Sequence, residues 1–213
     1  MPLVKICGIQ TLEAAEWAIE AGADLIGIIC VPNSKRTVSR NTAIQISRLL
    51  KSKPGSAKLV GVFMNQSVEE VSRLVEEYSV DFVQLHGDEN WEVYYEVLQR
   101  KIIKKVEFPR DCPLVEQMFD NGDKCIPLFD AGGAGGTGQQ LDWDSLREWS
   151  CSTGEKVSFL LAGGLTPDNV AEATKIPGVL GVDVSSGVEI NGKKDKLKII
   201  AFVRNAKGGK QLE

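Results

Sequence analysis

The stretch KLVGVFMNQSVEEVSRLVEEYSVDFVQLH, residues 58–86, contains one complete strand–helix–strand unit. Its ends, residues 58–63 and 81–86, are short apolar runs of the kind found in buried strands. Between them, residues 67–78 follow a helical period and begin with Ser67, a preferred helix N-cap. Because a helix joins the two strands, we expect them to be parallel and connected by a right-handed crossover.

The same unit recurs along the chain, since helical patterns separate most of the apolar runs. The expected strands are residues 3–7, 25–30, 58–63, 81–86, 102–108, 125–129, 158–163 and 181–185. The expected helices are residues 11–22, 41–51, 67–78 and 166–174. The last of these has Thr166 as its N-cap and Pro167 at its first position. Residues 111–123 are the weakest helix candidate.

Eight such units favour a closed (β/α)₈ TIM barrel over an open doubly wound sheet. The 213 residues divided by eight give about 27 per unit, close to the minimum for a βα repeat. No linker or change of composition marks a second domain, so we expect one barrel domain over residues 1–213. In such a barrel, the chemistry lies at the carboxyl ends of the strands and in the loops that follow.

The composition narrows the possible partners and the compartment. A formal net charge of −4 argues against nucleic-acid binding, which depends on clustered lysine and arginine. There are five cysteines and no C-x-x-C pair, which speaks against a disulfide framework and favours a reducing compartment. No apolar run approaches the ~20 residues of a membrane span, and the first residues lack signal-peptide features. We therefore expect a cytoplasmic protein without a membrane partner.

Cys7 is the cysteine that we interpret as functional. Leu3, Lys5 and Cys7 alternate onto one face of the first strand, and Cys7 stands at its carboxyl end before a glycine. The nearby lysine predicts an accessible, electropositive setting, which favours a reactive thiolate. The other four cysteines are interpreted as buried structural residues. They are Cys30, Cys112, Cys125 and Cys151.

Asp130 ends the sixth strand on the same face as Ile126 and Leu128, so we expect its carboxyl group to face the mouth of the barrel. Apolar neighbours would raise the pKa of that carboxyl group, as a general acid needs. The glycine-rich segment that follows Asp130, residues 131–138, is expected to close over a substrate. It contains a G-x-G-x-x-G spacing, but it is neither a P-loop nor the first βα turn of a dinucleotide fold.

The loops after the last two strands are the candidate phosphate site. Gly163 and Gly164 follow the seventh strand, and Ser186 and Gly187 follow the eighth. Barrels of this architecture often hold phosphate on the backbone N–H groups of these two loops. The sequence therefore predicts a phosphorylated ligand.

Three further residues share the inward faces of their strands. Gln84 and His86 lie on one face of the fourth strand. His86 is the sole histidine, and it either orders the site or is structural. A single histidine cannot form a metal cluster. Asp183 lies on the inward face of the eighth strand, which pairs with the first when a barrel closes. We therefore expect Lys5 and Asp183 to form a buried ion pair beneath the site, since an unpaired buried ammonium is costly.

Seven motifs resemble the phosphoribosylanthranilate isomerase family, and most closely its monofunctional fungal members. The motifs are KICG (5–8), VPNSKR (31–36), GVFMN (61–65), QLHGDE (84–89), GGTGQQLDW (135–143), LAGGLTPDNV (161–170) and GVDVSSGVE (181–189). The resemblance implies a (β/α)₈ barrel that performs an Amadori rearrangement in tryptophan biosynthesis without a metal or organic cofactor. The substrate would be N-(5-phosphoribosyl)anthranilate, a phosphorylated amino sugar, and the product 1-(2-carboxyphenylamino)-1-deoxyribulose 5-phosphate.

The resemblance also implies residue roles: Cys7 is the general base, Asp130 is the general acid, and Arg36 binds the anthranilate carboxylate. One departure is the short segment AGGA at 131–134, where many bacterial members are longer. Two alternatives stay open. A related barrel isomerase acting on a histidine-pathway aminoaldose would use two carboxylates, whereas this first strand ends in cysteine. A sugar-phosphate sensor or scaffold would need neither Cys7 nor Asp130. A monomer is favoured.

Overall fold

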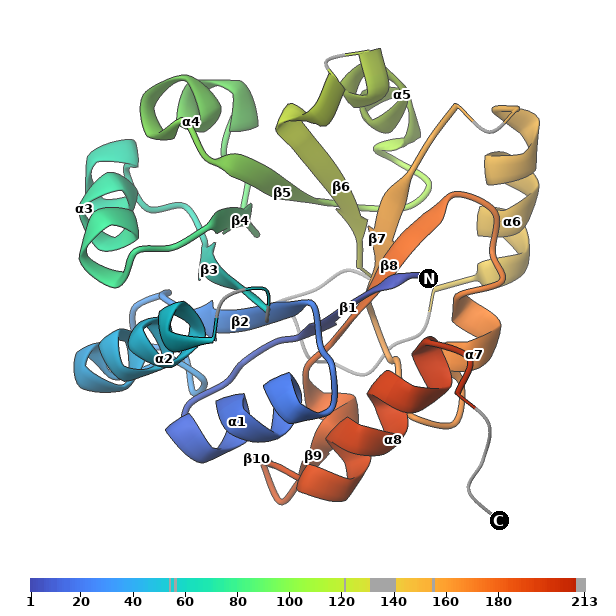
Figure 1. Cartoon of the computed structure of the whole chain (residues 1–213). Coiled ribbons are helices and arrows are strands. Elements are labelled where there is room, and N and C mark those ends of the chain that lie inside the picture. Colours follow the sequence, from blue (N-terminus) through green and yellow to red (C-terminus); the bar gives the residue numbers. More distant parts are fainter. Residues whose placement is uncertain (54, 56, 121, 131–140, 155, 210–213) are drawn as a thin grey trace.

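The computed structural model describes residues 1–53, 55, 57–120, 122–130, 141–154 and 156–209. Within these residues, eight parallel strands form a closed barrel in which each strand pairs with the next and β8 pairs with β1 (Figure 1). The barrel strands are β1 (Leu3–Ile6), β2 (Leu25–Ile29), β3 (Lys58–Phe63), β4 (Phe82–Leu85), β5 (Lys101–Val106), β6 (Cys125–Phe129), β7 (Phe159–Leu161) and β8 (Val179–Val184). The predicted closed barrel is therefore confirmed, and the open sheet is excluded.

The helices surround the barrel on its outside (Figure 1). They are α1 (Leu12–Glu20), α2 (Arg40–Ser52), α3 (Val68–Tyr78), α4 (Trp91–Leu98), α5 (Cys112–Asp120), α6 (Trp143–Ser152), α7 (Val170–Ala173) and α8 (Lys196–Ala206). Most begin after a side chain that accepts a hydrogen bond from a backbone N–H of the first turn, which satisfies a donor that the helix leaves open. These N-caps are Thr11, Ser39, Ser67, Asn90, Asp142 and Asp195.

The segment after β7 differs from the predicted helix over 166–174. Helix α7 begins only at Val170, and Thr166 is not its N-cap. Instead, the backbone N–H of Thr166 donates to Oδ1 of Asn169 at 2.8 Å, and Nδ2 of Asn169 donates to the carbonyl of Gly164 at 3.0 Å. The Asn169 side chain thus bonds the backbone on both sides of Leu165, and it fastens the turn after β7.

Two apolar layers hold the fold together. A small cluster fills the inside of the barrel, and a larger one lies between the strands and the helices. The inner cluster consists of Leu25, Val60, Ile103, Ile126, Leu128, Leu160 and Ala162. Cys30, Cys112 and Cys125 are buried, as predicted. The prediction for Cys151 is wrong: it is exposed, because α6 buries its other face through Leu146 and Ser150.

A short hairpin follows β8 and was not predicted. Strand β9 (Glu189–Ile190) pairs with β10 (Lys193–Lys194) in antiparallel fashion, so that Glu189 lies opposite Lys194. Asn191 and Gly192 connect the two strands, with φ angles of 51° and 74°. Both values lie in the left-handed region that a type I′ hairpin turn requires. In the described part of the chain, no helix has both the length and the apolar character needed to cross a membrane.

Candidate active site

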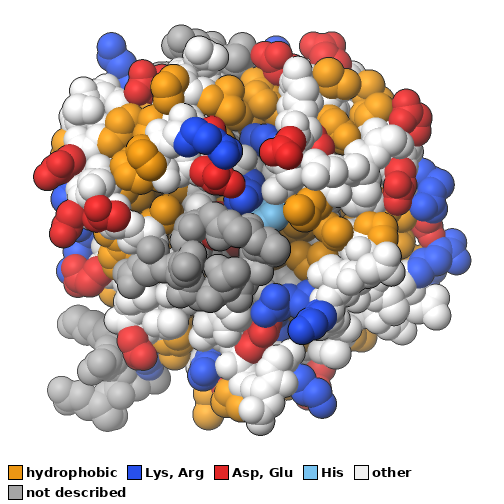
Figure 2. Space-filling view, turned by 180° about the vertical axis from the view of Figure 1, so that it is seen from behind, with side chains coloured by type: hydrophobic (Ala, Val, Ile, Leu, Met, Phe, Trp, Pro, Cys, Tyr) orange, Lys and Arg blue, Asp and Glu red, His pale blue; other side chains and the backbone are white. Residues whose placement is uncertain are grey.

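A cavity of about 330 Å³ opens at the carboxyl ends of the barrel strands. Figure 2 views this face, where basic and acidic side chains gather around the pale blue of the sole histidine. The residues that sequence reasoning assigned to the site and that line the cavity are Cys7, Arg36, Gln84, His86, Asp130, Gly163, Gly164, Asp183, Ser186 and Gly187. The barrel therefore brings together residues contributed by strands and loops distant in sequence.

Cys7 follows β1, and its backbone N–H donates to the carbonyl of Val184 at 2.8 Å. The prediction of an accessible thiol is wrong, since Cys7 is only 6% exposed. It packs against β2 so closely that a Cβ atom on Gly27 would lie 2.8 Å from the Cys7 sulfur. Burial raises the pKa of the Cys7 thiol, whereas the positive charge of Lys5 acts to lower it.

Lys5 and Asp183 form the predicted buried ion pair. Nζ of Lys5 lies 2.9 Å from Oδ2 of Asp183, and the Lys5 side chain is fully buried. The two residues are direct partners in the β1–β8 register. The alternation of side chains along each strand therefore predicts that they meet. Burial works to lower the pKa of Lys5, but attraction by Asp183 and by Cys7 together keeps that pKa above its ordinary value.

Removing one member of this pair should destabilise the barrel strongly. We expect Lys5→Met to lower the free energy of unfolding by roughly 3–5 kcal/mol, because it leaves the Asp183 carboxylate buried without its cation. Urea denaturation followed by circular dichroism measures the change. Lys58→Met is the matched control, since Lys58 and Asp81 are 3.7 Å apart and largely exposed. Its expected effect is at most about 1 kcal/mol. An equal, small effect of both variants would contradict the prediction.

Asp130 directly follows β6, and its backbone N–H donates to the carbonyl of Val106 on β5 at 3.4 Å. This bond extends the β5–β6 ladder by one step and brings the carboxyl-bearing residue to the cavity, whose wall it forms in part. Along the closed barrel, β6 and β1 are separated by β7 and β8, so Asp130 and Cys7 line different sides of the cavity. The predicted closing loop, residues 131–138, lies outside the described residues.

Polar atoms on the inward faces of β4 and β8 have no hydrogen-bond partner within the described residues. They are Oε1 of Gln84, Nδ1 of His86 and Oδ1 of Asp183. All three residues line the cavity. Burial lowers the pKa of His86 to about 4, assisted by the charge of Lys105, so its imidazole is neutral near pH 7. Such buried polar atoms are costly unless a partner satisfies them, which makes them suited to a polar ligand.

The loops after β7 and β8 pack backbone against backbone. Gly163 and Gly164 have φ angles of 85° and 69°, in the region that favours glycine. A Cβ atom on Gly187 would lie only 1.8 Å from the carbonyl oxygen of Leu165, so no other residue fits there without movement. Both loops line the cavity, so their close approach concentrates backbone groups at one edge of it.

Arg36 belongs to a charged cluster with Glu189 and Lys194, of which the sequence analysis predicted Arg36 alone as a site residue. Its Nε donates to Oε1 of Glu189 and its Nη2 donates to Oε2, both at 3.1 Å. Nζ of Lys194 lies 2.7 Å from Oε1 of Glu189. Glu189 and Lys194 were missed, although the Asn191–Gly192 dipeptide between them is a strong hairpin signal that would have paired them.

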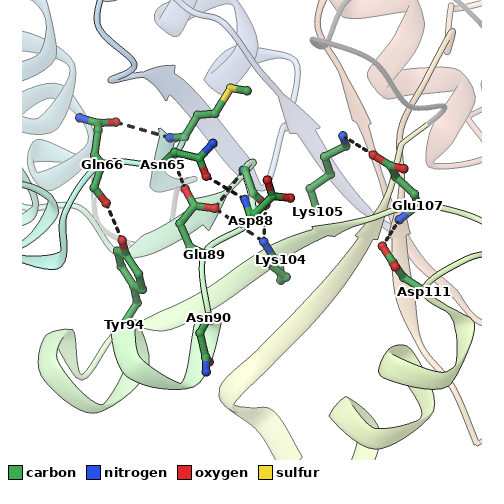
Figure 3. A network of polar contacts seen from close by, with 12 residues as sticks. Asn65, Gln66, Asp88, Glu89, Asn90, Tyr94, Lys104, Lys105, Glu107 and Asp111 are labelled. Atoms are coloured by element: carbon green, nitrogen blue, oxygen red, sulfur yellow. Dashed lines mark hydrogen bonds and ion pairs between the residues drawn. The ribbon is translucent and has the colours of Figure 1, made fainter.

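A second network fastens the loops after β3 and β4, and it is centred on Glu89 (Figure 3). Its Oε1 accepts from the backbone N–H of Asn65 at 2.6 Å, and its Oε2 accepts from that of Gly87 at 2.9 Å. Nζ of Lys104 lies 3.6 Å from the same carboxylate and also donates to the Gly87 carbonyl. Because Gly87 follows His86, this network holds the end of β4 at the cavity. In the described part of the chain, no group of three potential metal ligands was found.

Comparison with known proteins identifies close relatives. A family profile described as N-(5'phosphoribosyl)anthranilate (PRA) isomerase matches residues 4–205. The N-(5'-phosphoribosyl)anthranilate isomerase of Saccharomyces cerevisiae is 52% identical over 97% of this chain and 95% of its own length. The corresponding protein of Zygosaccharomyces bailii is 51% identical over 94% of this chain and 96% of its own length.

Solved structures give the same result. Phosphoribosyl anthranilate isomerase from Thermotoga maritima superposes with a TM-score of 0.83 at 35% identity, over 98% of this chain and all of the other. Another phosphoribosyl anthranilate isomerase structure, solved with reduced 1-(o-carboxyphenylamino)-1-deoxyribulose 5-phosphate, has a TM-score of 0.80 at 33% identity, again over 98% of this chain and all of the other. The likeness thus spans sequence and fold over nearly the whole chain.

Proposed function

The chain belongs to the N-(5'-phosphoribosyl)anthranilate isomerase family, and from this premise we propose how its cavity performs the isomerisation. The protein is an isomerase of tryptophan biosynthesis. Its proposed substrate is N-(5'-phosphoribosyl)anthranilate and its proposed product is 1-(2-carboxyphenylamino)-1-deoxyribulose 5-phosphate. The observation that carries the proposal is that a thiol and a carboxyl group, Cys7 and Asp130, line one cavity from β1 and β6.

The two anionic ends of the substrate need two binding regions. The phosphate binds the backbone N–H groups of Gly163, Gly164, Ser186 and Gly187, where two loops approach each other closely. The anthranilate carboxylate binds Arg36, whose planar guanidinium suits a carboxylate. The substrate's sugar then lies between these regions. Its hydroxyl groups are partners for Gln84, His86 and Asp183, whose buried polar atoms line the same cavity.

The chemistry begins with two proton transfers, which a tautomerisation follows. Asp130 donates a proton to the furanose ring oxygen, the C1′–O bond breaks, and the substrate nitrogen forms a Schiff base to C1′. The Cys7 thiolate removes the proton from C2′, and the electron pair of that C–H bond moves to give an enolamine. Tautomerisation of the enolamine yields the ketose. Lys5 stabilises the thiolate by its positive charge, against the effect of burial on the Cys7 pKa.

If Arg36 binds the substrate carboxylate, Arg36→Met should mainly raise KM. The contact exists in both the ground state and the transition state, so its loss weakens binding more than it slows the bound reaction. We expect KM to rise about tenfold or more, consistent with loss of a charge-assisted bidentate bond. Steady-state kinetics provide the measurement. Arg40→Met is the control, because the Arg40 side chain is 70% exposed and pairs with Glu77 on the surface. A collapse of kcat at unchanged KM would contradict this role.

The function itself is tested by supplying purified protein with N-(5'-phosphoribosyl)anthranilate and following the loss of its fluorescence. Rapid consumption with formation of the ketose supports the proposal. A histidine-pathway aminoaldose is supplied in parallel, because a barrel isomerase of that type would convert it instead. Binding of phosphorylated sugars without turnover of either compound would favour a sensor or scaffold. The cytoplasmic location and the monomeric state expected from the sequence stay predictions.

A further inference from the structure

Among the residues that the structure describes, the guanidinium of Arg36 bonds through its side edge. Nε and Nη2 donate to the two oxygens of Glu189, which is a bidentate bond along the side edge of the group. A guanidinium carries five N–H donors in a rigid fork, so this bond leaves three donors, of which one on Nη1 and one on Nη2 form the end edge. Arg36 lines the cavity, whereas Glu189 does not. The inner carboxylate thus fixes the plane of the fork, and the end edge stays geometrically suited to a second carboxylate.

Glu189 alone would neutralise the charge of Arg36 and weaken its attraction for an anionic ligand. Lys194 compensates the negative charge of Glu189. Its Nζ lies 2.7 Å from Oε1 of Glu189, and the two side chains are only 5% and 8% exposed. One carboxylate between two cations leaves the cluster with a net charge of +1. At so low an exposure, solvent screens these interactions only weakly.

Lys194 acts through its neighbours and not on the ligand. Besides Glu189, its ammonium donates to the carbonyl of Ser185 at 2.9 Å and to the Ser185 hydroxyl at 3.4 Å. Three contacts match the three donors of an ammonium group. The cluster also lies beside Cys7: a Cβ atom on the next residue, Gly8, would be 3.2 Å from Cδ of Arg36 and 3.5 Å from Nζ of Lys194.

The hairpin explains why these two residues occur together. Glu189 and Lys194 are cross-strand partners in the β9–β10 register, and the tight Asn191–Gly192 turn sets that register. A two-stranded hairpin is marginal by itself, and this one is built around a buried carboxylate that points at Arg36.

We propose that Glu189 and Lys194 are positioning residues for carboxylate recognition, with Glu189 orienting the Arg36 fork and Lys194 preserving its net positive charge. The inference rests on the proposed binding of the substrate carboxylate by Arg36. It predicts that changes at either residue weaken the binding of ligands with a ring carboxylate and spare ligands without one.

The test compares two ligands by isothermal titration calorimetry. One is reduced 1-(o-carboxyphenylamino)-1-deoxyribulose 5-phosphate, and the other is the same compound without its ring carboxylate. We expect K194M to weaken the first ligand about tenfold and to change the second less than about twofold, since only the first meets the charged cluster. K194R, which keeps the charge, should restore most of the affinity. K193M is the matched control, because Lys193 is the exposed neighbour on the same strand.

E189Q separates orientation from charge. The amide cannot accept both Arg36 donors, but it also removes a negative charge beside the guanidinium. If orientation matters, E189Q binds the carboxylated ligand more weakly than wild type does. If it binds that ligand more tightly, or if K194M behaves as K193M does, the inference is overturned. A different result, in which wild type fails to distinguish the two ligands, rejects the Arg36 carboxylate site itself. Circular dichroism melting confirms that each variant is folded.

Discussion

Replacing Cys7 with alanine is expected to lower kcat by at least about 10²-fold, the low end of what a general base contributes. The substitution removes the only proton acceptor assigned to C2′ and changes little else in the fold, because one sulfur atom is lost from a strand end. Steady-state turnover of N-(5'-phosphoribosyl)anthranilate gives the rate. KM should change much less than kcat, since proton removal belongs to the transition state.

The pKa of Cys7 also predicts how the rate depends on pH. An ordinary cysteine with a pKa of ~8.5 is about 3% thiolate at pH 7. Burial raises the pKa of Cys7, so the free enzyme holds a smaller fraction than that. Only the deprotonated form acts as a base, and its population grows as pH rises toward that pKa. Because Asp130 must be protonated at the same time, wild type does not isolate this effect. In Asp130→Asn, which has no titrating acid at this position, kcat/KM should rise between about pH 6 and 8, and the rise should be absent when Cys7 is also replaced by alanine.

Cys30→Ala is the matched control for this experiment. Cys30 also stands at the end of a barrel strand and is 7% exposed, but it does not line the cavity. Its replacement should leave kcat within about a factor of two, because it touches neither substrate nor the reacting atoms. Turnover near the wild-type value in Cys7→Ala, or equal losses in both variants, would remove Cys7 from the mechanism.

The barrel and its deepest polar contact were predictable because they depend on periodicity. Alternation by two places Lys5 and Asp183 on the inward faces of their strands, and closure of eight strands makes the first strand adjacent to the last. The 2.9 Å pair follows from those two rules without any knowledge of side-chain packing. Helix starts were predictable for a similar reason, since a cap such as Ser67 acts within one turn of its own helix.

Other features depend on neighbours that a single stretch of sequence does not identify. The position of Cys7 at a strand end suggested an exposed thiol, but the approach of Gly27 from the next strand buries it. After β7, the side chain of Asn169 bonds the backbone of Thr166 and of Gly164, and the helix begins only at Val170. Glu189 and Lys194 resemble ordinary surface charges in the sequence. Glu189 gains its place in the site through its contact with Arg36, 153 positions away, and Lys194 gains its place through its contact with Glu189.

Replacing Asp130 with asparagine is expected to lower kcat by about 10²–10⁴-fold, because the amide has nearly the same shape but cannot deliver the acid proton. The role is energetically demanding. An ordinary aspartate, with a pKa of ~3.9, is only about 0.1% protonated at pH 7, which corresponds to roughly 4 kcal/mol at about 1.36 kcal/mol per pKa unit. When the substrate fills the cavity and displaces water from the carboxyl group, this penalty falls, because desolvation favours the neutral acid.

Asp88→Asn is the control, because Asp88 is an exposed aspartate in the loop after β4 that does not line the cavity. The pH profile then separates acid catalysis from simple loss of charge. An acid must be protonated to act, so wild-type kcat should fall on the alkaline side as the bound-state carboxyl group loses its proton. In Asp130→Asn that alkaline limb should disappear, while the acidic limb assigned to Cys7 persists. A mutant with the wild-type rate and both limbs intact would show that the ring oxygen receives its proton from another group.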